Sequence, residues 1–389
     1  MKMQTVPLCE LGEIVSGSTP KTGVPEYWDG NIPWITPADL SNHEGIYFYG
    51  APKKISKAGF DSCSTTMLPA GSILFSSRAP IGHCALTTYP ACTNQGFKNI
   101  VPNKRLDPVY GYFALKFLTP AIVAMGRGAT FAEINKELFE SVHIPYCDLP
   151  QQRRIAGQLV QADRLRCTRR YALELTDTVL PATFRQLFGP RLKAGPFLAF
   201  GELVEITGGG TPARDRPEFY QGRIPWLTSK DMKGDYIWDT EEHITEKGIE
   251  ESATNLVPVG SILVVVKSKV LMHRLPVAIA KVPLCHGQDI KSIQCSRTLQ
   301  PEFARFVLKF HEGRLLNLAR GANTEGLTLP MLKELPVPTV RLSEQQHFSE
   351  IVTRHDCLCA VQREALREAE HLFQTLLYQA FSEGAYSRE

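Results

Sequence analysis

The sequence has little that points to secretion, to a membrane or to a disulfide framework. Residues 1–13 lack the basic start and apolar core of a signal peptide. The longest apolar run, Ser261–Val266, is too short to cross a bilayer and predicts a buried strand. The ten cysteines have no regular spacing, and the close pair Cys357 and Cys359 has no second pair near it. We therefore expect a cytoplasmic protein with reduced cysteines, no metal site and no membrane contact.

Motifs for nucleotide or group-transfer chemistry are also missing. No Gly-x-x-x-x-Gly-Lys-Ser/Thr loop is present, which argues against ATP binding of the P-loop kind. Asp107-Pro-Val-Tyr110 comes close to the Asp-Pro-Pro-Tyr loop of methyltransferases, but its later counterpart, Gln300-Pro-Glu-Phe303, has lost the acid. We interpret Asp107 as a helix N-cap and Pro108 as the first helical residue. No pair of carboxylates with a lysine at nuclease spacing recurs, so we predict no catalytic site in this chain.

Charge of either sign is not in large excess. The chain has 43 Lys and Arg against 40 Asp and Glu, with a net charge of +3 and a pI of about 8.3. A dedicated nucleic-acid domain usually has a pI above roughly 9. The balance permits nucleic-acid binding but does not argue for it. The 43% hydrophobic fraction is ample for the packed cores of two or three domains.

What the sequence does have is an internal repeat at an offset of about 190 residues. Four early segments, Leu11-Gly-Glu-Ile-Val15, Ser18-Thr-Pro20, Pro25-Glu-Tyr-Trp28 and Ile32-Pro-Trp-Ile-Thr36, return in order as Phe200-Gly-Glu-Leu-Val204, Gly210-Thr-Pro212, Pro217-Glu-Phe-Tyr220 and Ile224-Pro-Trp-Leu-Thr228. Later, Gly71-Ser-Ile-Leu74 returns as Gly260-Ser-Ile-Leu263. The period is far longer than the roughly 20–50 residues of solenoid repeats. Each copy should therefore be a domain.

Each copy is predicted to be an α/β (α+β) module of strands, turns and short helices, followed by a long helix. The predicted boundaries are residues 1–149 for the first module, 150–190 for a central helical spacer, 191–342 for the second module, 343–384 for a distal helix and 385–389 for a tail. Two long helices with narrow apolar stripes pack most economically as an antiparallel coiled coil, giving a pseudo-twofold molecule. The alternative is that each helix packs on its own module.

The helix starts and the apolar seam can be assigned to residues. Ser343-Glu-Gln-Gln346 predicts a capping box, Pro150 suits a first helical turn, and Pro181 should kink or end the first helix. The predicted seam includes Ile155, Leu159, Leu165, Ile351, Leu358, Leu372 and Leu376. A helix from Ser343 to Phe381 would extend about 58 Å. The kinked partner helix sets a shorter usable length of about 45 Å, which would hold the modules apart by roughly one to one and a half turns of DNA.

The ordered set of motifs, present twice over essentially the whole chain, resembles the specificity (S) subunit of type I restriction–modification systems. The signature consists of the Gly-x-Thr-Pro loop, the Pro-Glu-Tyr/Phe segment, the Ile-Pro-Trp and Gly-Ser-Ile-Leu strands and the helix starts at Pro150 and Ser343. The resemblance implies two target recognition domains, each of which reads one half of a split double-stranded DNA target. It implies two methyltransferase subunits docked on the helices and motor–nuclease subunits as further partners. S-adenosylmethionine, ATP and Mg would then be bound by those partners.

Candidate DNA-binding residues are those with side chains able to reach bases or phosphates. They are Ser18, Thr19, Lys21, Arg78, His83, Asn94, Gln95 and Lys98 in the first copy, and Thr211, Arg214, Lys267, Lys269, His273, Gln288 and Lys291 in the second. Their alternative roles are structural turns and solvated strand ends. Trp34 and Trp226 are predicted to be core residues.

Positions shared by both copies should be scaffold or backbone contacts, and positions that differ should read bases. The copies differ most after their Gly-Ser-Ile-Leu strands, between Ser76 and Ala91 and between Val265 and Leu284. This predicts two unlike half-sites and an asymmetric target. The near-neutral charge keeps open a two-headed protein-interaction scaffold, and a type II-like or other methyltransferase-linked defence system is a further alternative.

Overall fold

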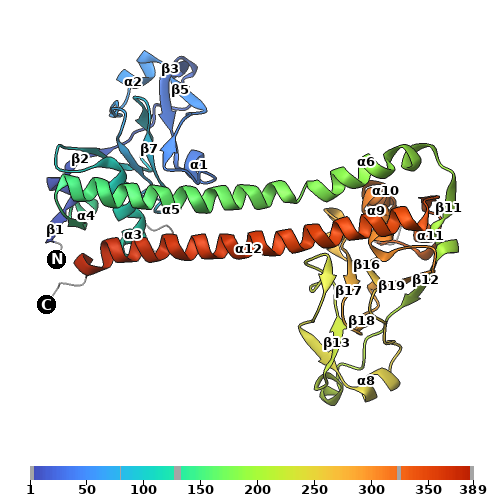
Figure 1. Cartoon of the computed structure of the whole chain (residues 1–389). Coiled ribbons are helices and arrows are strands. Elements are labelled where there is room, and N and C mark those ends of the chain that lie inside the picture. The colour runs from blue at the N-terminus through green and yellow to red at the C-terminus, as the bar shows by residue number, and fades with distance from the viewer. Residues whose placement is uncertain (1–3, 79, 127–132, 322–325, 386–389) are drawn as a thin grey trace. The chain divides into compact units, whose positions relative to one another are not determined.

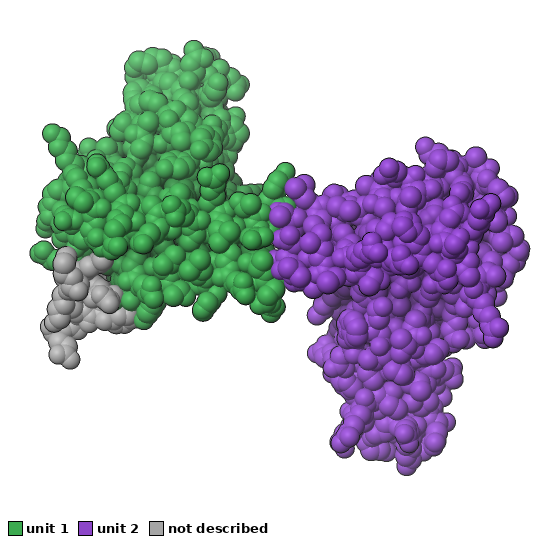
Figure 2. Space-filling view, in the orientation of Figure 1, with its two compact units in different colours: residues 1–171, 364–389 green, residues 172–363 purple. Residues whose placement is uncertain are grey.

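The computed structural model describes residues 4–78, 80–126, 133–321 and 326–385. The chain divides into two compact units, which Figure 2 distinguishes by colour. Unit 1 comprises residues 1–171 and 364–389, and unit 2 comprises residues 172–363. Each unit therefore combines one sheet module with parts of the long helices, α5 (Leu149–Thr176), α6 (Val179–Ala194) and α12 (Leu342–Ala385) (Figure 1).

The module of unit 1 contains a five-stranded sheet, a three-stranded sheet and a two-stranded sheet. The first has the order β2-β9-β6-β7-β4, the second β5-β3-β8 and the third β1-β10. The strands are β1 (Gln4–Pro7), β2 (Gly12–Ser16), β3 (Trp28–Ile35), β4 (Tyr47–Phe48), β5 (Lys53–Ile55), β6 (Ile73–Phe75), β7 (Cys84–Thr87), β8 (Cys92–Thr93), β9 (Lys98–Pro102) and β10 (His143–Tyr146). Its helices are η1 (Leu8–Glu10), η2 (Pro25–Tyr27), α1 (Pro37–Leu40), α2 (Lys57–Asp61), α3 (Pro108–Met125) and α4 (Lys136–Glu140).

The module of unit 2 has the same three sheets in the same orders, β12-β19-β16-β17-β14, β15-β13-β18 and β11-β20. The strands are β11 (Phe197–Ala199), β12 (Val204–Gly208), β13 (Ile224–Leu227), β14 (Tyr236–Ile237), β15 (Glu242–Ile244), β16 (Ile262–Val265), β17 (Val277–Ala280), β18 (Cys285–His286), β19 (Ile290–Cys295) and β20 (Pro336–Pro338). Its helices are α7 (Phe200–Leu203), η3 (Pro217–Tyr220), α8 (Glu246–Glu250), η4 (Lys269–Met272), α9 (Pro301–Phe310), α10 (Glu312–Gly321) and α11 (Leu329–Lys333).

The repeat found in the sequence extends to strand register, except in its first segment. Ser16 faces Lys98 and Gly208 faces Lys291, so Leu11 corresponds to Leu203 and the predicted pairing of Leu11 with Phe200 is wrong by three residues. Ile73 faces Ile100 across β6 and β9, and Ile262 faces Ile293 across β16 and β19. The turn before each of these strands needs glycine, because Gly71 and Gly260 have φ values of 87° and 89° in the left-handed region. The strands predicted at the two Gly-Ser-Ile-Leu segments are confirmed as β6 and β16, and the predicted buried strand within Ser261–Val266 runs from Ile262 to Val265.

Helix α3 confirms the interpretation of Asp107 and adds an apolar segment that the sequence patterns did not single out. The Asp107 carboxylate accepts hydrogen bonds from the amides of Val109 and Tyr110, both at 3.0 Å, so it is the N-cap. Among the described residues, α3 is the one helix that is long and apolar enough to cross a membrane. Its residues Tyr110–Leu115 and Ile122 are buried, and the large ones belong to the unit 1 core. This apolar stretch is thus a core helix.

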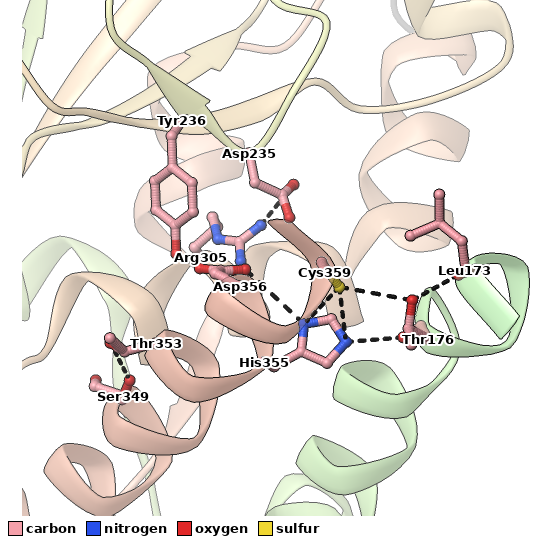
Figure 3. A network of polar contacts seen from close by, with 10 residues as sticks. All are labelled: Leu173, Thr176, Asp235, Tyr236, Arg305, Ser349, Thr353, His355, Asp356 and Cys359. Atoms are coloured by element: carbon pink, nitrogen blue, oxygen red, sulfur yellow. Dashed lines mark hydrogen bonds and ion pairs between the residues drawn. The ribbon is translucent and has the colours of Figure 1, made fainter. Parts of the chain in front are cut away.

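The first long helix breaks ahead of Pro181, as predicted. Helix α5 ends at Thr176 and α6 starts at Val179, because Pro181 has no amide hydrogen to donate to the carbonyl of Asp177. The carbonyl of Thr176, the last residue of α5, lies 2.9 Å from Nε2 of His355 on α12 (Figure 3). Nearby on α12, Asp356 accepts a 2.6 Å hydrogen bond from the hydroxyl of Tyr236 on β14. His355 therefore contacts the end of α5 at the break, and the Tyr236–Asp356 hydrogen bond ties the same turn of α12 to β14.

The predicted capping box at Ser343 is wrong. Helix α12 already begins at Leu342, and Glu344 reaches back to the amide of Arg341 at 3.3 Å. The residue that ties the helix to the module is the next one, Gln345, which is buried. Its side chain accepts from the amide of Gln300 at 2.9 Å and donates to the carbonyls of Thr298 and Val340 at 3.2 and 3.0 Å.

Gln152 makes the same three hydrogen bonds at the start of α5. It accepts from the amide of Asp107 at 2.8 Å and donates to the carbonyls of Arg105 and Cys147 at 2.9 and 2.8 Å. A buried amide that satisfies three backbone groups is costly to remove, because each group would then be left without a partner. Gln152 therefore fixes the start of α5 against the loop before α3, and Gln345 fixes the start of α12 against the loop before α9.

We expect Gln345→Leu to lower the free energy of unfolding by about 2 kcal/mol, since it removes the partner of the buried Val340 carbonyl and of the partly buried Gln300 amide and Thr298 carbonyl. The measurement is urea unfolding of the full chain. Gln346→Leu is the matched control, because the neighbouring Gln346 is exposed and a surface change should stay within roughly 0.5 kcal/mol. Equal effects of the two substitutions would contradict the role given to Gln345.

On α12 the apolar stripe that faces inward is shifted by one residue along the sequence from the predicted seam. Ile155 and Leu159 are buried and Ile351 and Leu376 are half-buried, but Leu165, Leu358 and Leu372 are exposed at 40%, 49% and 44%. Among the residues of α12 whose burial is described, the buried apolar ones are Phe348, Val352, Cys359, Ala369, Phe373, Leu377 and Phe381. Val352, Cys359, Phe373 and Leu377 each follow a predicted seam residue directly. Two adjacent stripes of α12 are apolar, and only packing shows which one faces inward.

The helix segments run antiparallel within each unit and also pack on the module. In unit 1, Arg166 lies 4.2 Å from the ring centroid of Phe373, and Arg170 pairs with Glu370 at 3.0 Å. In unit 2, Phe184 contacts Phe348 and Arg191 pairs with Glu344 at 2.8 Å. The two packing schemes weighed from sequence thus occur together, because the same cores include module residues.

Candidate nucleic-acid interface

The Gly-x-Thr-Pro loop of unit 1 lies against the turn that contains Gln95. The Ser18 amide donates to the carbonyl of Thr93 at 2.9 Å, and the Thr19 hydroxyl donates to the side chain of Gln95. Trp34, which is buried as predicted, donates its indole N–H to the carbonyl of Ser18 at 3.0 Å. Candidates 76 residues apart are therefore neighbours, and Gln95 is exposed.

Lys98 and Arg78 extend this group along the same end of the five-stranded sheet. Lys98 faces Ser16 in the register of β9 and β2, and it is almost fully buried. Burial lowers the pKa of the Lys98 ammonium, which the charge of Glu133 partly opposes. The Ser77 amide donates to the carbonyl of Gly96 at 2.8 Å, so the segment that ends in exposed Arg78 lies beside Gln95.

The other candidates of unit 1 have more local surroundings. The Asn94 side-chain oxygen accepts from the Gly96 amide at 3.0 Å, so it also shapes the turn. Lys21 is exposed beyond the Thr-Pro loop. His83 is half-buried, and burial followed by the charge of Lys116 lowers the pKa of its imidazole. The neighbouring Gly82 packs against the Thr119 side chain of α3, which places this end of the loop beside α3.

Unit 2 repeats the loop contact with different side chains. The Gly210 amide donates to the carbonyl of His286 at 3.1 Å, and buried Trp226 donates to the carbonyl of Gly210 at 3.1 Å. Lys291 faces Gly208 in the register of β19 and β12, as Lys98 faces Ser16. The two candidates on either side of this contact, Thr211 and Gln288, are both exposed.

Arg214 has a structural environment that the sequence did not indicate. Its guanidinium pairs with Glu242 at 2.8 Å and lies 4.5 and 4.9 Å from the ring centroids of Tyr220 and Trp226. It packs the Thr-Pro loop onto β13. In contrast, Lys267 and Lys269 are exposed after β16, and His273 is exposed just past η4.

A residue that sequence reasoning missed is Glu133. Its carboxylate lies 2.9 Å from Nε of Arg78. The one signal available was its repeat position, where the second copy has Gly326. Across the described ranges, no group of three His, Cys, Asp or Glu side chains is placed to hold a metal ion. The arrangement presents cations, amides and hydroxyls at one sheet end, which suits hydrogen bonding to nucleic acid.

The fold and these residues define a class: a tandem pair of sheet modules, each with polar side chains gathered at one sheet end and each packed on long helices. The chain belongs to the family described as the type I restriction modification DNA specificity domain, which it matches over residues 1–174 and again over residues 197–371. The domain duplication inferred from the repeat is thereby confirmed.

Relatives and solved structures agree with this membership. The chain is 29% identical over 277 residues to the type I restriction enzyme MjaIX specificity subunit of Methanocaldococcus jannaschii, covering 65% of this chain and 63% of that protein. It is 32% identical over 161 residues to the EcoR124I/EcoR124II specificity subunit of Escherichia coli, covering 41% of this chain and 40% of that protein. The aligned parts thus span less than two thirds of either relative.

The fold is also found in solved structures. The S subunit of a type I restriction–modification system from M. genitalium superposes with a TM-score of 0.60 at 16% identity, covering 97% of this chain and 96% of that one. A chain from a study of complex assembly and conformational transition of the type I R-M system superposes with a TM-score of 0.64 at 17% identity, covering 97% of both chains. At these identities the likeness concerns the fold.

Proposed function

We propose that this chain is the DNA sequence-specificity subunit of a type I restriction–modification complex. Each module reads one half of a bipartite, asymmetric DNA target. The observation that carries the proposal is one fold used twice with one register but different polar side chains at equivalent places. Arg78 and Asn94 of the first module have Lys267 and Gly287 as counterparts. Equal scaffolds with unequal surfaces suit the reading of two unlike sequences.

The long helices have two roles in this proposal. They set the unspecific spacer between the half-sites, for which the 44 residues of α12 offer a helix of about 66 Å. They also dock two methyltransferase subunits, and the exposed Leu165, Leu358 and Leu372 suit a protein interface better than water. Motor–nuclease subunits join for cleavage, and the complex acts in the cytoplasm.

The chemistry is assigned to those partners. Methyl transfer to a flipped adenine, with S-adenosylmethionine, belongs to the methyltransferase subunits, and ATP and Mg belong to the motor–nuclease subunits. The Asp107 carboxylate supports this assignment because it is occupied as a helix cap. The chain itself contributes recognition and binds no cofactor.

A salt titration of the complex with its methyltransferase subunits tests the proposal. DNA binding should weaken steeply with salt, by a slope of about −0.9 per phosphate contacted. A scaffold with two protein-binding heads would give a flat slope, and that result would refute DNA reading. Methylome sequencing of cells that express the three subunits should then show one split, asymmetric motif. A contiguous or palindromic motif would favour a type II-like system.

A further inference from the structure

Module 1 carries an ion pair at the end of β6 that joins two distant segments. Arg78 and Glu133 face each other as an antiparallel bridge, and Glu133 Oε1 lies 2.9 Å from Arg78 Nε. The residues next to this pair are also joined: the amide of Ile134, which follows Glu133, donates to the carbonyl of Ser77, which precedes Arg78, at 3.0 Å. Backbone and side-chain contacts therefore fix this arginine at the same place.

Module 2 has the same backbone contact but lacks the acid. The Leu327 amide donates to the carbonyl of Val266 at 2.7 Å, which makes Lys267 the counterpart of Arg78 and Gly326 the counterpart of Glu133. A side chain at 326 would meet the Val266 carbonyl oxygen at 2.6 Å from its Cβ. A glutamate at position 326 would therefore clash with the backbone, so no carboxylate can lie next to Lys267 from this position. The ion pair that holds an arginine in place is a feature of module 1.

The clamped arginine lies among the candidate DNA contacts. The Ser77 amide donates to the carbonyl of Gly96, beside Gln95, and Lys98 has both Glu133 and Arg78 among its charged neighbours. Glu133 thus lies near two cations of the same sheet end. The Glu133 carboxylate offsets part of the repulsion between Arg78 and Lys98, and it holds the Arg78 guanidinium at this end of the sheet.

The chemistry of arginine separates a base contact from a phosphate contact. The printed contact of the ion pair joins Glu133 Oε1 to Arg78 Nε, and the Arg78 side chain is 48% exposed, so part of the guanidinium faces solvent and can donate to a ligand. A planar fork in a fixed direction matches O6 and N7 of guanine in the major groove. A phosphate needs only a nearby cation, for which an exposed lysine such as Lys267 suffices.

We propose that Arg78 reads a guanine in the half-site recognised by module 1 and that Glu133 is the positioning residue that holds the guanidinium for it. The inference rests on the proposed function, because it requires that module 1 read DNA. It adds a base identity, a residue pair and a difference between the modules. Preorganisation by a second residue is what makes such a contact selective.

The test is methylome sequencing of cells that express the methyltransferase subunits with wild-type chain or with Arg78→Lys, Arg78→Ala or Glu133→Gln. Purified complexes are then assayed for methylation of duplexes carrying the wild-type motif or single-base changes. Arg78→Lys keeps the charge and loses the fork. Glu137→Gln is the matched control for Glu133→Gln, since Glu137 is exposed in the same region and makes no ion pair within the described ranges.

Both Arg78 variants should relax one guanine position of one half-site by roughly ten- to hundredfold, with the other half-site unchanged. Glu133→Gln should relax the same position less, and Glu137→Gln should relax none. A uniform loss on all sequences, with a salt slope lower by about one, would make Arg78 a phosphate contact and overturn the inference. An unchanged motif, or relaxation in both half-sites, would also overturn it. If wild-type complexes show no sequence preference, the proposed function itself fails.

Discussion

Exchanging residues 1–149 for the corresponding module of another family member is expected to replace one half of the DNA target and leave the other half unchanged. The reason is that unit 1 contains its own sheets and its own set of polar side chains around Gln95 and Lys98. Base specificity depends on contacts within a few ångströms of the base edge, so the sequence preference of the second module should stay the same after the exchange.

The structure adds a condition to this experiment. The end of α12 packs into the core of module 1: Phe381 contacts Tyr110 and Phe117, with centroids 5.2 and 5.7 Å apart, and Phe373 contacts Phe113. A donor module must therefore retain aromatic residues at the positions of Tyr110, Phe113 and Phe117, or bring its own end of α12. Without them the chimera is expected to lose core packing rather than to change specificity.

Methylome sequencing of the chimera with its methyltransferase subunits measures the outcome. The reciprocal exchange of residues 191–342 is the control and should alter the other half-site. If either exchange changed both halves of the motif, the model of two independent readers would be wrong. Thermal unfolding of each chimera separates a misfolded unit from a changed specificity.

Phe348→Ala is expected to reduce the free energy of unfolding of unit 2 by about 3–5 kcal/mol. Phe348 is fully buried on α12, where it contacts Phe184 and Phe188 of α6 and Phe306 of α9. It therefore joins both helices to the module, and the small alanine would leave a cavity at their junction. Part of the loss comes from aromatic contacts whose ring centroids lie 5.0–5.7 Å apart.

Two controls make this prediction specific. Phe348→Leu keeps most of the volume and should cost less than about 1.5 kcal/mol. Leu358→Ala removes a large apolar side chain from the same helix at a site that is 49% exposed, so it should cost no more than roughly 0.5 kcal/mol. Urea unfolding followed by tryptophan fluorescence measures all three. If Leu358→Ala lowered the free energy of unfolding by more than Phe348→Ala does, the seam predicted from the sequence would be right and the stripe through Phe348 would not.

Much of the fold and some of the candidate site could be predicted from the amino-acid sequence alone. Local rules identified the Asp107 cap, the helix break near Pro181 and the strand after Gly71, because each depends on a few neighbouring residues. The same rules failed at Ser343, because the residues before it can also start a helix. They failed along α12, because two adjacent stripes of this helix are apolar. For the candidate site, the pattern selected residue types, but it could not pair Thr19 with Gln95 or Arg78 with Glu133.

The sequence by itself determined that one module occurs twice, because duplicated motifs in constant order do not depend on how the chain folds. It also indicated a break in the first long helix, since Pro181 has no amide hydrogen for the preceding turn, although Pro120 and Pro190 lie inside α3 and α6 without breaking them. Only the tertiary structure decided which apolar stripe of α12 faces inward, because burial depends on the shape of the partner surface. Only the tertiary structure gave Arg78 its acid partner, since ion pairs form between side chains that folding brings within a few ångströms.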